Sequence, residues 1–139
     1  MTINEIEAAI IDEFSAFDDW MDRYNHLIEM GKELKMIDEK YRIQNNLLNG
    51  CQSRVWLNAA YQGGKVYFSA DSDAVITKGL VSLMIRVLDG RSPDEILNAE
   101  LGFIEKIGLK EHLSPTRSNG LTSMVKQMKL YALAFKAKG

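Results

Sequence analysis

A change in the spacing of the apolar residues limits most strongly what this chain can fold into. In VWLNAAYQ (55–62) and KVYFSA (65–70), side chains of one kind recur at every second position, as they do on strands with two different faces. Gly63 and Gly64 separate these runs, and paired glycines favour a tight turn because they adopt positive φ angles without strain. We therefore expect an antiparallel β-hairpin between residues 55 and 70.

The residues before the hairpin predict two helices and a further strand. Thr2 and Glu5 have the spacing of a capping box, and helical spacing of apolar residues follows them. A second apolar stripe begins at Trp20 and predicts a helix to about Lys35. YRIQNNLLN (41–49) has a weaker strand pattern, and we expect it to be the first strand of a three-stranded meander.

The residues after the hairpin return to helical spacing. Asp71 or Ser72 is expected to cap a helix that stops near Gly90. Ser92, followed by proline and by Glu95, has the form of a capping box, and AELGFIEKIG (99–108) predicts another short helix. The last helix is expected from 114–115 to about residue 136. The whole pattern predicts one α+β domain over 1–139, with N-terminal helices, a three-stranded antiparallel sheet and C-terminal helices packed on one face.

The composition excludes several classes of function. A formal net charge of −2 lacks the basic excess that phosphate binding needs, so we expect no nucleic-acid partner. No apolar run is long enough to span a bilayer and no signal peptide is present, so we expect a soluble cytoplasmic protein without a membrane partner. A single cysteine forms no internal disulfide and no Cys-rich zinc site, and the two histidines form no metal motif.

That single cysteine, Cys51, has two interpretations. A lone cysteine is commonly a small buried hydrophobe. However, Cys51 follows Asn49 and Gly50, which are typical of turns, and turns often present reactive groups. The turn setting favours a functional thiol without excluding a structural one.

The surrounding sequence narrows the chemistry of a functional thiol. Hydrolysis at a cysteine needs a nearby imidazole, but we expect His26 on the exposed side of a helix and His112 in a loop. Disulfide reduction needs a second, resolving cysteine, which the chain lacks. Thiolate exchange with a sulfur carried by a partner needs neither, because the partner can supply the acid–base help.

Three blocks of the sequence resemble the SufE family, the sulfur acceptors of cysteine desulfurases in iron–sulfur cluster assembly. They are GCQSRVW (50–56), FSADSDAVITKGL (68–80) and LSPTRSNGL (113–121), and the resemblance extends from residue 24 through the last helix. LKMIDEKYRIQNN (34–46) lacks the prolines that family members often carry there. The resemblance implies an α+β fold similar to that of the IscU scaffold.

The resemblance also implies a function. Cys51 corresponds to the acceptor cysteine, which takes persulfide sulfur from a pyridoxal-phosphate-dependent, SufS-like desulfurase and passes it to a SufB-like scaffold. The chain is then an accessory protein and activator that needs no cofactor or metal of its own. Further residues at matching positions are expected to support the cysteine loop or to bind the partner: Gln52, Ser53, Asp73, Arg117, Asn119 and Gly120.

Each of these positions also has an ordinary structural interpretation. Gln52 and Ser53 are common turn residues, Asp73 suits the start of a helix, and Arg117 suits a solvated helix surface. Gly120 lies inside an expected helix, where glycine costs about 1 kcal/mol relative to alanine, so we expect the Cys51 loop to pack closely against it. Three rival functions stay open: a sulfur carrier for another desulfurase route, a single-cysteine peroxide sensor, and an interaction module with a structural cysteine.

Overall fold

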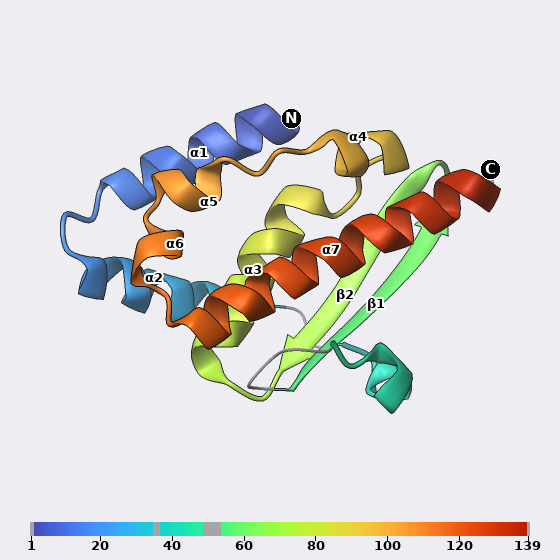
Figure 1. The fold of residues 1–139 in the computed structure, drawn as a ribbon, viewed down its shortest axis with the longest axis horizontal. Helices are drawn as coiled ribbons and strands as arrows, with labels where there is room; N and C mark the ends of the chain where they lie inside the picture. Colours follow the sequence, from blue (N-terminus) through green and yellow to red (C-terminus); the bar gives the residue numbers. More distant parts are fainter. Residues whose placement is uncertain (1, 35–36, 49–53, 139) are drawn as a thin grey trace.

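The hairpin expected from the alternating runs forms the sheet of the protein (Figure 1). The structure is a computed structural model that describes residues 2–34, 37–48 and 54–138. Strands β1 (Val55–Gln62) and β2 (Lys65–Ser72) pair antiparallel, with Val55 opposite Ser72 and Gln62 opposite Lys65. Gly63 and Gly64 make the turn with φ angles of 59° and 80°, as the paired glycines predict.

The predicted first strand over 41–49 is wrong, and the described part of the chain has a two-stranded sheet. Two short 3-10 helices occupy most of this stretch, η1 (Glu39–Tyr41) and η2 (Gln44–Asn46). Local polar bonds favour these turns over a strand: Asp38 accepts a hydrogen bond from the backbone of Lys40, and the amide of Asn46 donates to the carbonyl of Tyr41 at 2.7 Å.

Single bridges replace a third strand on both edges of the hairpin. Leu47 forms an isolated antiparallel bridge with Trp56 on β1, and Arg91 forms another with Val66 on β2. The second bridge is closed by backbone bonds of 2.8 Å, from Val66 N–H to Arg91 and from Gly90 N–H to Val66. These contacts satisfy part of the polar backbone that an open sheet edge leaves unpaired.

The N-terminal helices follow the sequence pattern closely. Helix α1 (Ile3–Ser15) begins with the expected capping box, in which Thr2 and Glu5 exchange two hydrogen bonds of 3.1 Å. Helix α2 (Trp20–Lys32) begins after its cap, Asp19. It ends three residues earlier than expected, because the chain turns at Glu33 and Leu34.

After the hairpin the chain forms helices α3 to α7. Helix α3 (Val75–Leu88) has Ala74 as its N-cap residue, and no side chain caps it. The expected capping by Asp71 or Ser72 is therefore wrong. Helix α4 (Pro93–Asn98) has the expected capping box of Ser92 and Glu95. The helix expected over 99–108 is reduced to α5 (Phe103–Lys106), and α6 (Leu109–His112) follows Gly108, whose φ is 84°.

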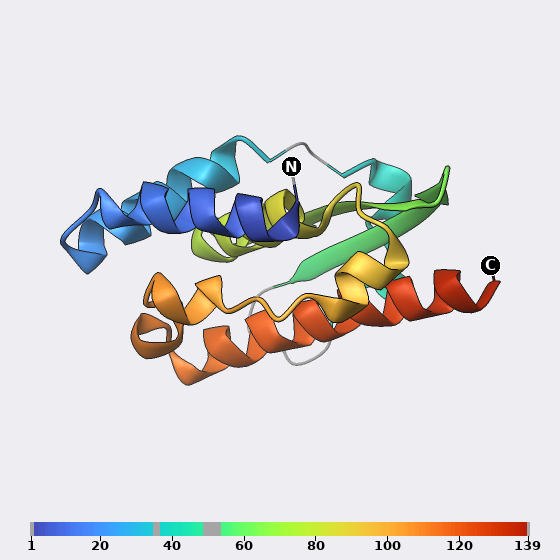
Figure 2. The same cartoon turned by 90° about the horizontal axis from the view of Figure 1, so that it is seen from above.

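The last helix, α7 (Pro115–Lys138), lies over the hairpin (Figure 1), and the turned view in Figure 2 shows helix and sheet as neighbouring layers. Its Tyr131 hydroxyl donates to the Leu57 carbonyl at 3.5 Å, and its Phe135 stacks on Tyr61 with ring centroids 5.2 Å apart. The core face of the hairpin contributes Val55, Leu57, Val66, Phe68 and Ala70 to the hydrophobic core. None of the helices in the described ranges is long and apolar enough to cross a membrane.

Helices α2 and α3 approach each other so closely that glycine is required at their contact. A Cβ atom placed on Gly79 would lie 2.2 Å from the backbone oxygen of Leu27, well inside van der Waals contact. A Cβ on Gly31 would lie 2.7 Å from the backbone nitrogen of Gly79. Because the obstacles are backbone atoms, a rotamer change cannot relieve the clash, and the helices would have to separate.

We expect Gly79→Ala to lower the free energy of unfolding by about 1–3 kcal/mol, the usual range for overpacking. Urea denaturation followed by circular dichroism measures this change. Gly102→Ala is the matched control, because a Cβ there meets nothing within 4 Å and the φ is −62°. Equal stability of the two variants would contradict the close approach of α2 and α3.

Candidate functional site

The described residues that flank Cys51 lie at the end of the hairpin opposite its glycine turn. Cys51, Gln52 and Ser53 lie outside the described residues, so the site is built from the residues on either side. Before the gap, Leu48 N–H donates to the Val55 carbonyl at 2.9 Å. On the other side of Cys51, Arg54 is bonded to Asp73, the residue that follows β2.

Asp73 holds the chain where it returns to the sheet. Its Oδ1 accepts the backbone N–H of Arg54 at 3.0 Å, and its own N–H donates to the Arg54 carbonyl at 3.2 Å. Asp73 is exposed and does not cap α3, whose N-cap is Ala74. The structure therefore directs the Asp73 carboxylate to the backbone beside the predicted site, and the helix-start interpretation is wrong.

The other predicted residues lie near the beginning of α7. Arg117 is partly buried, and its Nη1 donates to the hydroxyl of Tyr24 on α2 at 3.4 Å. The solvated-surface interpretation of Arg117 is therefore incomplete, because the side chain links α7 to α2. Asn119 is exposed and Gly120 is buried. The expected packing of the Cys51 loop against Gly120 involves residues outside the described ranges and stays a prediction.

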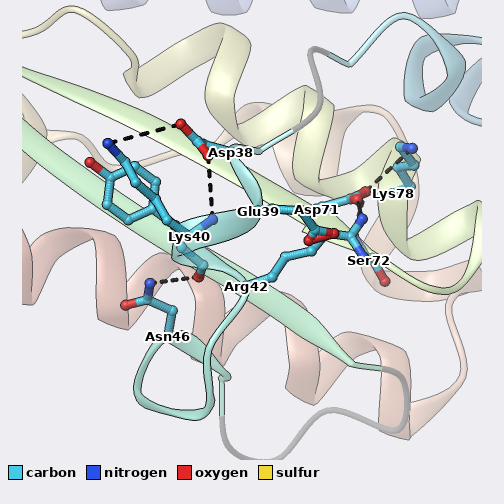
Figure 3. Close-up of polar contacts among 9 residues, drawn as sticks. Asp38, Glu39, Lys40, Arg42, Asn46, Asp71, Ser72 and Lys78 are labelled. Carbon is cyan, nitrogen blue, oxygen red and sulfur yellow. Dashed lines mark hydrogen bonds and ion pairs between the residues drawn. The ribbon is translucent and has the colours of Figure 1, made fainter.

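A buried ion cluster on the second face of the hairpin was not predicted from the sequence (Figure 3). Asp71 is only 1% exposed, and its carboxylate pairs with the guanidinium of Arg42 and, at 3.3 Å, with the ammonium of Lys78. Its Oδ1 also accepts the backbone N–H of Ser72 at 2.8 Å. Two cations and a backbone donor offset the cost of removing this charge from water.

The register of the hairpin explains why Asp71 is buried on this face. Asp71 lies directly opposite Trp56, and the Arg42 guanidinium lies 4.8 Å from the centre of a Trp56 ring. Side chains alternate between the two faces of a strand, so Asp71 lies on the face opposite to that of residues 66, 68 and 70. This alternation is the one signal in the sequence that could have revealed an acidic residue on the second face. The partner Arg42 is 29 residues away from Asp71, so the sequence does not identify it.

Both histidines differ from their expected settings. His26 is not on an exposed surface: its Nε2 lies 2.5 Å from a carboxylate oxygen of Glu13, and its ring packs against Phe14 and Phe17 at centroid distances of 5.0 Å. His112 lies in helix α6, where its ring stacks on Trp20 at 4.5 Å. Each ring is thus engaged by other elements of the fold.

Arg86 and His26 both contact the carboxylate of Glu13. Burial by itself would raise the pKa of Glu13. Hydrogen bonds from Arg86, at 2.9 Å, and from His26 outweigh that effect and lower the pKa below its ordinary value. These three residues line a groove of about 1020 Å³ to which α1, α2, α3 and β2 contribute.

Comparison with known proteins shows what this chain is similar to. The family model "SufE: Fe-S metabolism associated domain" matches residues 8–132. An uncharacterized SufE-like protein of Synechocystis is 40% identical over 128 residues, which cover 92% of this chain and 80% of that protein. Another, from Rhizobium meliloti, is 41% identical over 125 residues, which cover 86% of this chain and 89% of that protein.

Two further comparisons concern a plant protein and a solved structure. The chain is 37% identical over 131 residues to SufE-like protein 1, chloroplastic/mitochondrial, of Arabidopsis thaliana, and the match covers 94% of this chain but 35% of the plant protein. A hypothetical protein from Thermus thermophilus, solved in solution, superposes with a TM-score of 0.77. It is 21% identical and covers 93% of this chain and 94% of its own, so this likeness concerns the fold.

We expect Asp73→Ala to loosen the chain where it re-enters the sheet, because Arg54 N–H loses its acceptor. Hydrogen exchange followed by NMR should show faster exchange of the Arg54 amide, with little change at the centre of β1. Asp73→Asn retains an oxygen acceptor and serves as the matched control. Unchanged exchange at Arg54 in the alanine variant would show that the carboxylate does not hold this amide.

Glu13 should make the stability of the protein depend on pH in the acid range. A carboxyl group with a lowered pKa in the folded state stabilises the fold above its unfolded pKa, and this contribution is lost as the pH falls through the folded pKa. As the pH falls below the ordinary glutamate pKa of about 4.3, the parent protein should lose more stability than Glu13→Gln, because the pKa of Glu13 is lowered in the folded state. Parallel curves of melting temperature against pH for the two proteins would refute this.

Proposed function

Because this chain belongs to the SufE family, whose domain is associated with Fe–S metabolism, we propose that it accepts and carries sulfur for iron–sulfur cluster assembly. The donor is a pyridoxal-phosphate-dependent cysteine desulfurase of SufS-like type, and the receiver is a SufB-like scaffold. The chain is an accessory protein that binds no pyridoxal phosphate itself. By unloading the desulfurase it raises the turnover of that enzyme, and it does so in the cytoplasm.

The proposed step is a thiolate exchange at Cys51. The Cys51 thiolate attacks the terminal sulfur of the persulfide on the desulfurase, and a new sulfur–sulfur bond forms on Cys51. The old sulfur–sulfur bond breaks, and its electron pair stays on the cysteine sulfur of the desulfurase, which takes up a proton. The exchange therefore needs no external oxidant or reductant. A second exchange of the same kind delivers the sulfur to the scaffold.

The observation that carries the proposal is the presence of one cysteine in 139 residues, within the family block GCQSRVW. A chain with no second cysteine cannot resolve a persulfide into an internal disulfide, so the carried sulfur leaves only by transfer to another molecule. This property suits a carrier and distinguishes it from a dithiol oxidoreductase.

The anchored chain on both sides of the cysteine is consistent with this role. Leu48 is bonded to Val55 and Arg54 is bonded to Asp73, so the sheet holds the chain three residues before and three residues after Cys51. Three residues of extended chain span at most about 11 Å. We therefore expect Cys51 to act close to this end of the hairpin.

The remaining predicted residues take supporting roles in this proposal. Gln52 and Ser53 hold the segment that contains the thiol, and Asp73 fastens its C-terminal end. Arg117, Asn119 and Gly120, near the beginning of α7, support the same segment or contact the desulfurase. These assignments rest on the family blocks in which the residues lie.

The direct test is to incubate the protein with a cognate desulfurase and cysteine and then to weigh the intact chain. We expect a mass gain of one sulfur atom that is reversed by a thiol reductant, and stimulation of sulfide release by the desulfurase. Cys51→Ser should lose both properties. A parent chain that never gains sulfur, or full stimulation by Cys51→Ser, would refute the proposal.

A displaced cysteine provides a sharper control than removal alone. Ser15 is exposed on α1, so Cys51→Ser combined with Ser15→Cys restores one accessible thiol at a different site. We expect this variant to react with a small alkylating reagent but to gain no sulfur from the desulfurase. Sulfur uptake at the parent rate would mean that any exposed thiol serves, and that the Cys51 block is not a dedicated acceptor.

The peroxide-sensor alternative makes a different prediction. A sensor thiol is oxidised to a sulfenic acid by dilute peroxide without any desulfurase, and a dimedone-type reagent traps that product. For a sulfur carrier we expect little trapping under conditions in which the desulfurase loads the chain fully. Testing several desulfurases in parallel distinguishes the proposed SufS-like donor from another desulfurase route.

A further inference from the structure

Arg42 connects the chain that precedes the cysteine segment to the second face of the hairpin. We call residues 38–48 the arm; it contains η1, η2 and the bridge from Leu47 to Trp56. We propose that Arg42 is a positioning residue for sulfur transfer, because its bond to Asp71 fastens the arm and so sets where the chain leaves the sheet before Cys51. This inference rests on the proposed function and assigns Arg42 and Asp71 a part in it.

Apolar packing contributes little to holding the arm on the sheet. Neither η1 nor η2 contains a buried residue, and Ile43 is 47% exposed. At the end of the arm the side chain of Leu48 is only partly buried against the core. The buried Ile37 fixes the chain just before the arm, the backbone bonds of 47 and 48 attach its end, and Arg42 attaches its middle.

The attachment at Arg42 is directional. Its guanidinium meets the Asp71 carboxylate and lies over Trp56, so it engages both strands of the hairpin at the pair of residues that face each other. In Figure 3 the Arg42 side chain reaches from the arm toward the Asp71 carboxylate, and Lys78 approaches that carboxylate from the other side. A planar guanidinium can bond a carboxylate and stack on an aromatic ring together, which the ammonium group of lysine cannot do.

Lys78 makes the proposal testable without unfolding the protein. If Arg42 is removed, Asp71 keeps the ammonium group of Lys78 at 3.3 Å and the backbone N–H of Ser72 at 2.8 Å. The buried negative charge of Asp71 therefore keeps a cation and a hydrogen-bond donor. The main effect of removing Arg42 is that the arm loses its bond to the sheet. Removing Asp71 instead leaves Arg42 and Lys78 without their shared anion.

Position matters for the proposed step because sulfur exchange needs the attacking thiolate in line with the bond that breaks. A misplacement of about 1 Å can slow a reaction by about a hundredfold, even when the change lies far from the reacting atoms. Without Arg42 the arm is held at its two ends, by the buried Ile37 just before it and by residues 47 and 48, and its middle loses its bond to the sheet. The exit point of the cysteine segment is then less defined. We therefore expect a lower rate of sulfur transfer within the complex and little change in the affinity for the desulfurase.

The experiment compares Arg42→Gln, Arg42→Lys and a control, Lys40→Gln, in single-turnover transfer from a persulfide-loaded desulfurase. Lys40 lies in η1, two residues before Arg42, and its ion pair with Asp38 is exposed and 3.9 Å long. We expect Arg42→Gln to lower the maximal transfer rate by about tenfold, with little change in the half-saturating concentration of the desulfurase. Arg42→Lys should recover part of the rate, and Lys40→Gln should match the parent.

Two readouts separate positioning from a general loss of structure. Hydrogen exchange should become faster at Leu48 and along the arm in Arg42→Gln while it stays unchanged in β1 and β2. The pH profile of Cys51 alkylation, measured without the desulfurase, should also differ from that of the parent. If Arg42→Gln does not fold, the same measurements on Arg42→Lys test the positioning role.

The possible outcomes distinguish this inference from the proposed function. A parent chain that accepts no sulfur refutes the proposed function itself. A parent that accepts sulfur, together with folded Arg42 variants that transfer at the parent rate with an unchanged alkylation profile, refutes only the positioning role. A slower rate with a loosened arm and an intact hairpin supports it.

Discussion

The carboxylate of Asp71 is the constraint on which the arrangement around the predicted site depends. It is almost fully buried, and a buried anion is tolerated only when cations and hydrogen-bond donors replace its lost water. Here three segments supply them: Arg42 from the arm, Ser72 from β2 and Lys78 from α3. Removing one partner of such a cluster typically costs about 3–5 kcal/mol where it leaves a charge uncompensated. The charge therefore specifies how arm, sheet and helix meet.

This cluster and the Arg54–Asp73 contact lie at the same end of the hairpin. The chain reaches that end through the arm, bonds β1 at Leu48, and enters β1 through Arg54, which is bonded to Asp73 just after β2. A sulfur carrier of the proposed kind has to meet two different proteins in turn, so the chain on either side of its thiol has to be held in place. A hairpin end at which the chain is bonded on both sides of the cysteine segment meets that need.

Local chemistry explains which parts of the fold could be predicted. The capping boxes at Thr2 and Ser92 formed as expected, because each is completed by a glutamate three residues later. The hairpin formed with the expected turn, because Gly63 and Gly64 supply its positive φ angles. The strand expected over 41–49 failed because its pattern was weak and local bonds to Asp38 and from Asn46 stabilise turns there. The cap assigned to Asp71 failed because a distant arginine bonds that carboxylate instead.

By itself the sequence determined the α+β class, the hairpin, most helix starts, the single cysteine and the family blocks around it. These properties depend on residue types and on spacings of a few positions, so they can be read without knowing what lies far along the chain. Only the tertiary structure decided that Asp71 is buried with Arg42 and Lys78, that Glu13 engages His26, and that Gly79 lets α3 meet the backbone of α2. The physical reason is the same in each case. The energy of a buried charge or a close backbone contact depends on which atoms surround it, and folding brings those atoms from other elements of the chain.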